Sequence, residues 1–326
     1  MKHGEAFVNG VRLHYVEEGS GPLVVLLHGF PDFWFSWRSQ LPALAAMGFR
    51  VVAPDMRGYG ESDKPAGTAA YRMDVLTTDI AELVKHLGEK KASVVGHDWG
   101  GAVAWSLPRY HPQLVERLVI LNSPHPRAFR RELATSQQLF RSWYMFFFQL
   151  PVIPEMAIQL ANFSPLERAL TKLGGNLTPE ELDQYRQAWK RPGALTAALN
   201  YYRAAFQLTA PRTPSRIETP TLLIWGEKDP ALGVSLTEGL DKWVPNLKIE
   251  KLPNAGHWVH WDATATVNRL IGAFLSEGKA ASKPPLRTRK RTRTRTPRAK
   301  PAPLVSGRRS APRGRTGPKR RTRAPG

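Results

Sequence analysis

The sequence GHDWG at residues 96–100 carries the clearest chemical signal in this chain. It has the form Gly-x-nucleophile-x-Gly, which is typical of a tight turn that raises one side chain above a parallel sheet where a helix begins. The raised residue is Asp98. Because a carboxylate is already an anion at neutral pH, it can displace a leaving group from saturated carbon and form an ester with the enzyme. The turn therefore favours epoxides or alkyl halides as substrates over peptides or carboxylic esters.

Two residues that follow predicted strands can assist this carboxylate. Asp229 comes shortly after the strand 221–225, and His257 comes after the strand 247–252. His257 can act as a general base near neutral pH, and Asp229 can accept the other imidazole N–H. The order Asp98, Asp229, His257 is the nucleophile-acid-histidine order of the α/β-hydrolase fold.

Each assisting residue has an alternative. An acid could instead follow the strand 118–121, but that loop begins with Asn122, so Asp229 is preferred. His260 competes with His257, although it lies past the loop. Asp229 could also be a capping residue of a turn before a proline.

Two backbone N–H groups are predicted to hold an oxyanion. The strand 23–27 ends in the sequence HGFP, where a glycine allows close approach of the backbone and the Phe30 N–H can point at the site. The N–H of Trp99, directly after the nucleophile, is the second candidate donor. The alternative interpretation is that the glycine only forms a tight turn. The loop 55–62 is expected to brace the edge of the sheet and is assigned no chemistry.

The elements that must position these residues alternate between strands and helices. An Asn-Gly pair at residues 9–10 predicts a hairpin at the start of the chain. Further strands are predicted at 23–27, 50–54, 92–95, 118–121, 221–225 and 247–252, with helices at 71–87 and 265–275 among them. This pattern predicts an α/β protein with a mostly parallel, doubly wound sheet.

The predicted domain organisation follows from where the alternation breaks. Residues 1–125 form the first part of the core, 126–216 an all-helical lid that includes one helix over 128–150, and 217–278 the second part of the core. Residues 279–326 contain 18 Lys or Arg and no Asp or Glu, which leaves about +2 of the net charge of +20 for the rest. This low-complexity tail is predicted to be disordered.

Composition limits the function further. The chain has no cysteine, which excludes disulfides, thiolate nucleophiles and cysteine-bound metals. Its first residues lack the apolar run of a signal peptide, so a cytoplasmic location is expected. The basic tail allows nonspecific contact with nucleic acid or an anionic surface, and it has no aromatic residues to stack on bases.

Taken together, these motifs resemble the α/β-hydrolase-fold epoxide hydrolases over about residues 5–277. The resemblance is carried by HGFP at 28–31, GHDWGG at 96–101, Asp229, and GHW at 256–258. It implies hydrolysis of a small apolar epoxide by water, with no metal or organic cofactor. It also implies two lid tyrosines that donate to the epoxide oxygen, by position Tyr144 and Tyr202, with Tyr201 as the alternative if the register is off by one. Pro108 departs from the pattern and is expected to kink or shorten the helix after the turn.

The nearest alternative is a dehalogenase, which uses the same aspartate nucleophile. Fluoroacetate-type dehalogenases place arginine directly after the nucleophile, where this chain has Trp99. Haloalkane dehalogenases usually have asparagine where Phe30 stands, and they lack the tyrosine pair. The resemblance therefore favours epoxide hydrolysis.

Overall fold

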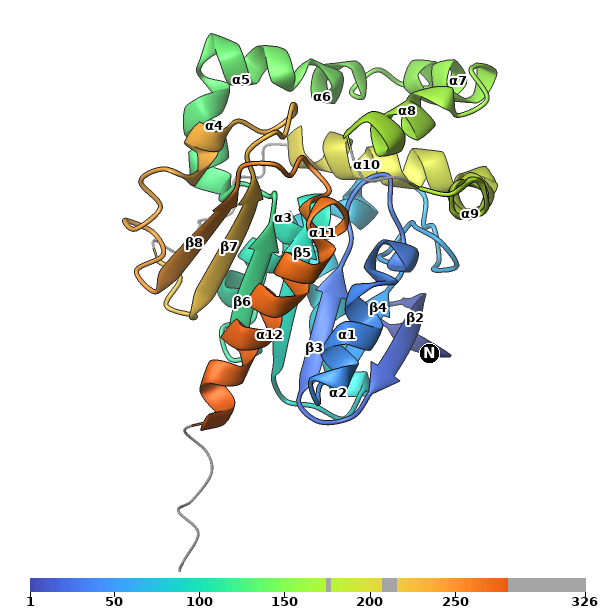
Figure 1. Cartoon of the computed structure of the whole chain (residues 1–326). Helices are drawn as coiled ribbons and strands as arrows, with labels where there is room; N and C mark the ends of the chain where they lie inside the picture. Colours follow the sequence, from blue (N-terminus) through green and yellow to red (C-terminus); the bar gives the residue numbers. More distant parts are fainter. Residues whose placement is uncertain (174–176, 207–215, 281–326) are drawn as a thin grey trace, which may run out of the picture. The chain divides into compact units, whose positions relative to one another are not determined.

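A mostly parallel β-sheet organises the computed structural model, which describes residues 1–173, 177–206 and 216–280 (Figure 1). Within this part of the chain the sheet has eight strands in the order β1-β2-β4-β3-β5-β6-β7-β8. β2 pairs antiparallel with β1 and β4, and the other neighbours pair in parallel. The strands are β1 (Lys2–Val8), β2 (Val11–Gly19), β3 (Leu23–Leu27), β4 (Arg50–Pro54), β5 (Ala92–His97), β6 (Val115–Leu121), β7 (Thr221–Gly226) and β8 (Leu247–Leu252). The predicted fold class is confirmed.

The first hairpin forms because two adjacent residues accept left-handed backbone angles. Asn9 has φ +47° and Gly10 has φ +75°, and Val8 pairs directly with Val11 across the turn. Positive φ at both central residues defines the type I′ turn, whose twist matches that of the flanking strands. The hairpin predicted from the Asn-Gly pair is therefore confirmed.

Helices cover both faces of the sheet, so the central strand β3 is apolar and buried along its whole length. The helices α2 (Met73–His86) and α3 (Asp98–Tyr110) pack on one face, and α1 (Gln40–Ala46) and α12 (Thr264–Ala280) on the other. Neighbouring residues of β3 illustrate this. Val25 packs in the core between the sheet and α2 and α3, and Val24 packs in the core between the sheet and α1 and α12. Successive side chains of a strand point to opposite faces, and a sheet covered on both faces needs both sets to be apolar.

In the described residues between β6 and β7, all regular elements are helices. Its helices are α4 (Pro126–Leu133), α5 (Ser136–Arg141), α6 (Trp143–Phe147), α7 (Ile153–Leu160), α8 (Ser164–Leu173), α9 (Pro179–Lys190) and α10 (Ala194–Phe206). Figure 1 shows them above the end of the sheet where the parallel strands finish. The single helix predicted over 128–150 is wrong. The Thr135 side chain accepts the Gln138 N–H and so starts a new helix after α4, and a further break follows at Ser142.

Two other helices differ from their predictions near their C-terminal ends. α3 continues to Tyr110, two residues beyond Pro108, so the proline lies in the last turn. α12 reaches Ala280, five residues beyond the predicted end of that helix and two residues into the predicted basic tail. The rest of that tail, 281–326, lies outside the described residues. Among the residues that are described, no helix has the length and apolar character needed to cross a membrane.

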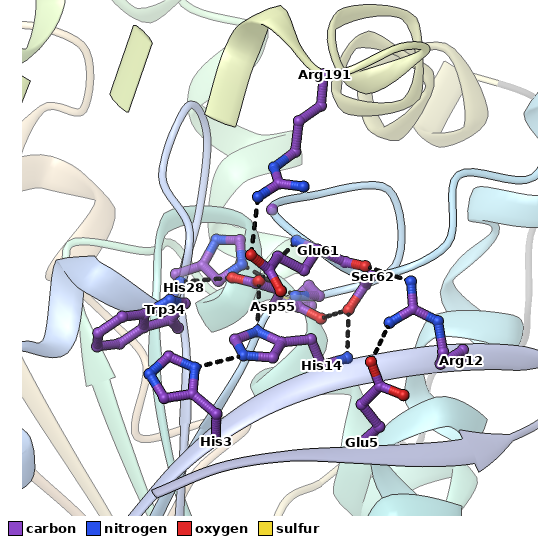
Figure 2. Close-up of polar contacts among 12 residues, drawn as sticks. His3, Glu5, Arg12, His14, His28, Trp34, Asp55, Glu61, Ser62 and Arg191 are labelled. Atoms are coloured by element: carbon purple, nitrogen blue, oxygen red, sulfur yellow. Dashed lines mark hydrogen bonds and ion pairs between the residues drawn. The ribbon is translucent and has the colours of Figure 1, made fainter. Parts of the chain in front are cut away.

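A buried carboxylate holds the loop after β4 against the sheet, as Figure 2 shows. Asp55 Oδ1 accepts the Trp34 N–H at 2.9 Å, and Oδ2 accepts the Glu61 N–H and bonds His14 Nδ1, both at 2.8 Å. Burial would raise the pKa of Asp55, but the hydrogen bond and charge of His14 and the two N–H groups lower it overall. This loop therefore ties β4 to β2 and to the segment that follows β3.

Candidate active site

The nucleophile candidate stands on a strained turn between β5 and α3. Asp98 has φ +49°, a region that residues with a side chain rarely adopt. A Cβ at Gly96 would overlap the backbone of Gly100, and one at Gly100 would overlap the backbone of Leu27 on β3. Glycine is required at both positions because the turn is packed this closely. The sequence signature GHDWG thus has a direct steric cause.

Both predicted oxyanion donors contact this carboxylate. The Phe30 N–H donates to Asp98 Oδ1 at 2.8 Å, and the Trp99 N–H also bonds the carboxylate. The Ser123 hydroxyl donates to the Asp98 carbonyl oxygen at 2.8 Å and fixes the turn from below. Burial raises the pKa of Asp98, and the charge of His257 and the two N–H groups lower it in part.

His257 lies between the two aspartates. Its Nδ1 is 2.7 Å from Asp229 Oδ2, and its Nε2 is 3.8 Å from Asp98 Oδ2. The other Asp229 oxygen accepts the N–H groups of Ala231 and Leu232 at 2.8 and 3.0 Å. Burial alone would lower the pKa of His257, but the charge and hydrogen bond of Asp229, together with the charge of Asp98, raise it to about 9. The geometry suits an imidazole oriented by one carboxylate and facing another.

Tyr144 and Tyr202 face the nucleophile from the helices above it. Their ring centroids are 5.9 Å apart, and the Tyr202 ring lies edge-on to Trp99 at 5.0 Å. Burial raises the pKa of both hydroxyls, and the nearby charge of Asp98 raises both further. Both therefore stay protonated and able to donate. The alternative Tyr201 has its hydroxyl engaged, since it donates to the Arg57 carbonyl at 2.8 Å.

Comparisons with known proteins agree with this geometry. Residues 22–264 match the model of the alpha/beta hydrolase fold family. Epoxide hydrolase 4 of Mus musculus is 40% identical over 280 residues, covering 82% of this chain and 77% of that protein. The AB hydrolase superfamily protein YfhM of Bacillus subtilis is 41% identical over 272 residues, covering 82% and 95%. The crystal structure of Bacillus megaterium epoxide hydrolase in complex with an inhibitor has a TM-score of 0.79 and 34% identity, covering 84% of this chain and all of that one.

The chain belongs to the α/β-hydrolase-fold epoxide hydrolases. The resemblance predicted from the motifs is thereby confirmed, as is the assignment to a family of hydrolases. The roles of individual site residues stay predictions, and the structure adds neighbours that the motifs did not reveal.

Asn122 is a site residue of this hydrolase that the sequence interpretation missed. It follows β6, and its Nδ2 donates to Asp229 Oδ2 at 2.8 Å. Its Oδ1 accepts the N–H of Gly226 at 2.8 Å, so one side chain holds both the acid and the end of β7. The sequence does mark this position, because Asn122 begins the loop after the strand 118–121, where a catalytic acid could also stand. Its role depends on a partner more than 100 residues away in the chain.

Asp32 is a second residue of the hydrolase site that the sequence interpretation missed. It is buried, and its Oδ2 accepts the Trp258 indole N–H at 2.9 Å and lies 3.8 Å from His97 Nδ1. Burial raises the pKa of Asp32 to about 7, although the Trp258 hydrogen bond lowers it in part. Nothing in the local sequence marks this residue, since it follows the HGFP motif like an ordinary loop aspartate.

The competing histidine lies elsewhere in the hydrolase. His260 Nε2 is 3.0 Å from the Ser36 hydroxyl, and its ring packs on Trp37 at 4.7 Å. Burial lowers the pKa of His260 well below its usual range, so the ring stays neutral. His97 packs beside the turn, and its Nε2 bonds the His257 carbonyl at 3.0 Å. Within the described residues no group of three or more His, Asp or Glu side chains is arranged to hold a metal ion.

Proposed function

We propose that this protein hydrolyses epoxides to vicinal diols through a covalent ester on Asp98. One observation carries the proposal. The Asp98 carboxylate has Oδ1 held by the Phe30 N–H, while Oδ2 faces His257, and two protonated tyrosines lie close above. Its relatives include proteins named epoxide hydrolases, which supports the same substrate class.

In the first step the carboxylate acts as the nucleophile. Oδ2 of Asp98 attacks a ring carbon of the epoxide, because Oδ1 is occupied by a backbone donor. The C–O bond of the ring breaks as the new ester bond forms. Tyr144 and Tyr202 hydrogen-bond the ring oxygen, and one of them gives it a proton, since an alkoxide is a poor leaving group.

In the second step water cleaves the ester. Esterification removes the negative charge of Asp98, one of the charges that raise the pKa of His257, so His257 loses its proton more readily. That proton passes to the tyrosinate left by the first step, so the tyrosine is protonated again. The neutral imidazole takes a proton from water, and the water oxygen attacks the ester carbonyl carbon. The N–H groups of Phe30 and Trp99 hold the oxyanion. As the tetrahedral intermediate collapses, its bond to the product oxygen breaks, and its hydroxyl proton passes to the leaving alkoxide. The diol leaves, Asp98 is again a carboxylate, and His257 is again protonated.

Residues 126–216, whose described elements are helices, are proposed as a lid over this centre, inserted between core segments 1–125 and 217–278. The inner side chains of these helices are mainly apolar and form a core of their own with Phe33 and Trp258. Phe30, Trp99 and Tyr144, which border the site, pack against this core. These apolar surroundings support a small apolar epoxide as the substrate.

One turnover in ¹⁸O-water tests the mechanism. Styrene oxide is supplied below the enzyme concentration, and the Asp98 peptide and the diol are analysed by mass spectrometry. We expect the label in the Asp98 carboxylate and unlabelled oxygen in the diol, because water attacks the ester carbonyl. Label that enters only the diol would show direct attack of water on the epoxide. Halide release from 1-bromobutane without diol formation from styrene oxide would replace the proposed substrate class.

A further inference from the structure

The outer helices of the lid expose an unusual number of large apolar side chains. Of the thirteen exposed large apolar side chains among the described residues, nine fall within residues 139–160. Among these nine, the most exposed side chains are those of Leu160 at 84%, Phe140 at 77% and Trp143 at 66%. We call the exposed apolar side chains of residues 139–160 the apolar face. A concentration of exposed apolar side chains in neighbouring elements often marks an interaction site, because isolated domains rarely expose large apolar patches.

The polarity of α5 is reversed relative to an ordinary surface helix. Gln138 is buried, and its amide donates to the Ala231 carbonyl at 2.9 Å and to the Ser142 hydroxyl at 3.0 Å. Leu139 and Phe140 point outward instead. A helix that buries one of its glutamines while it exposes both of its apolar residues lacks the pattern expected of a helix facing water.

α7 is apolar on both of its sides. Ile158 and Pro154 are buried against the lid, while Ile153, Met156 and Leu160 are exposed. Met156 and Leu160 follow Ile153 by three and seven positions, so the three side chains lie along one side of the helix. A helix with apolar side chains on two opposite sides is favoured by apolar surroundings on both of them. Figure 1 shows α5, α6 and α7 in a row on the outer side of the lid, with α10 and α4 between them and the sheet.

The basic charge of the chain indicates which kind of partner the apolar face contacts. Between Leu133 and Leu166 the only acidic residue is Glu155, which is buried and paired with Arg203 at 2.7 Å. Residues 281–326 add 17 Lys or Arg and no Asp or Glu. A second copy of the chain would bring two net charges of +20 together, whereas an anionic lipid surface attracts them.

We propose that the apolar face docks on the surface of an anionic phospholipid bilayer. The aromatic and aliphatic side chains of α5, α6 and α7 enter the interface between headgroups and acyl chains, where Trp and Phe are favoured. The basic residues beyond Ala280 supply the second attraction, since one signal alone holds a protein on a membrane only weakly. Docking of this kind does not depend on the reaction proposed for Asp98.

Vesicle sedimentation with the full chain tests the proposal. The vesicles contain phosphatidylcholine alone, or phosphatidylcholine and phosphatidylserine at roughly 7:3, the second being the anionic surface. We expect binding to the anionic vesicles, weakened but not abolished in roughly 0.5 M NaCl, because salt screens only the electrostatic part. Replacing Arg291, Arg293 and Arg295 by Gln removes part of the salt-sensitive binding.

The variant Phe140→Ser/Trp143→Ser/Leu160→Ser is expected to lower the affinity for anionic vesicles at least about tenfold. Trp143→Ser alone gives a smaller loss and serves if the triple variant unfolds, which its thermal midpoint reports. Phe7→Ser is the matched control, because Phe7 is 76% exposed but lies on β1, outside the apolar face. The control should bind within about twofold of the parent.

Three outcomes would overturn the proposal. The first is wild-type binding by folded variants of the apolar face, which would leave the basic residues as the whole attraction. The second is an equal loss in Phe7→Ser. The third is a parent protein that is dimeric in sedimentation equilibrium and becomes monomeric in the triple variant without any change in vesicle binding, which would assign the face to a second copy of the chain.

Discussion

At the scale of single residues, the charge of Asp98 connects the proposed roles of its neighbours. It raises the pKa of His257 and of both lid tyrosines. The resting site therefore holds protonated donors around an anion, which suits attack by the carboxylate and proton donation to the ring oxygen. Once the ester forms, that charge is gone, and the imidazole is released to act as a base.

The tyrosine pair gives a residue-scale prediction with a built-in control. Tyr202→Phe should lower the rate of ester formation about 10²-fold, because it removes a hydroxyl donor to the epoxide oxygen. Tyr201→Phe should keep that rate within about threefold while costing roughly 1 kcal/mol of stability, since its hydroxyl bonds the Arg57 carbonyl instead. Rapid-quench measurement of the ester on Asp98 and urea unfolding separate the two effects. The reverse ranking of the two variants would move the donor to Tyr201.

At the scale of elements, the site exists because the ends of four parallel strands meet. Phe30 follows β3, Asp98 follows β5, Asp229 follows β7 and His257 follows β8. In an open α/β sheet the loops at the carboxyl ends of the strands form the binding crevice. Asn122, after β6, occupies the remaining position and ties the loops on its two sides together.

Removing the Asn122 side chain should therefore affect both activity and stability. In Asn122→Ala, Asp229 loses a donor and the Gly226 N–H loses its acceptor, which we expect to cost about 1–3 kcal/mol of unfolding free energy. The turnover rate should fall about tenfold or more, with the apparent pKa of its basic limb changed, because Asp229 orients His257. Urea unfolding and a pH–rate profile check both effects. Asn246→Ala is the control, since Asn246 donates to the Glu218 carbonyl on the surface; equal effects in the two variants would contradict a role in the site.

At the scale of the whole molecule, protonation of His257 couples the site to global stability. The pKa of His257 is about 9 in the folded protein, against an ordinary value of 6.5. A raised folded-state pKa stabilises the protein fully below pH 6.5, and this contribution is lost as the pH rises through about 9. The protein should thus lose stability across this pH range because of a single side chain.

The variant His257→Gln isolates this contribution. The difference in unfolding free energy between the parent and the variant should shrink steadily from pH 6.5 to pH 9, because only the parent binds the extra proton. Urea unfolding of both proteins at several pH values measures the difference. A difference that stays constant over the range would show that His257 is not protonated in the folded state.

Local patterns predicted much of this protein because their causes are local. The Asn9-Gly10 pair sets a hairpin through its own backbone angles, and an apolar run such as residues 23–27 shows a strand covered on both faces. The cause of the GHDWG turn is equally local. A Cβ on either of its outer glycines would overlap the backbone of the same strand-turn-helix unit or of the adjacent strand. The prediction of one helix over 128–150 was wrong for a reason that is also local. The Thr135 side chain caps a new helix there, although the segment is apolar enough for a single long one.

From the sequence alone came the α/β class, the position of the proposed nucleophile and the order of its proposed partners. These depend on periodicity and on steric demands that a short segment carries by itself. Only the tertiary structure decided that the Tyr201 hydroxyl bonds the Arg57 carbonyl, which histidine faces the Asp98 carboxylate, and that Asn122 and Asp32 lie beside the site. Each of those depends on how a buried polar group finds its partner across a distance of many residues, and such pairings form only when the strands and helices have packed together.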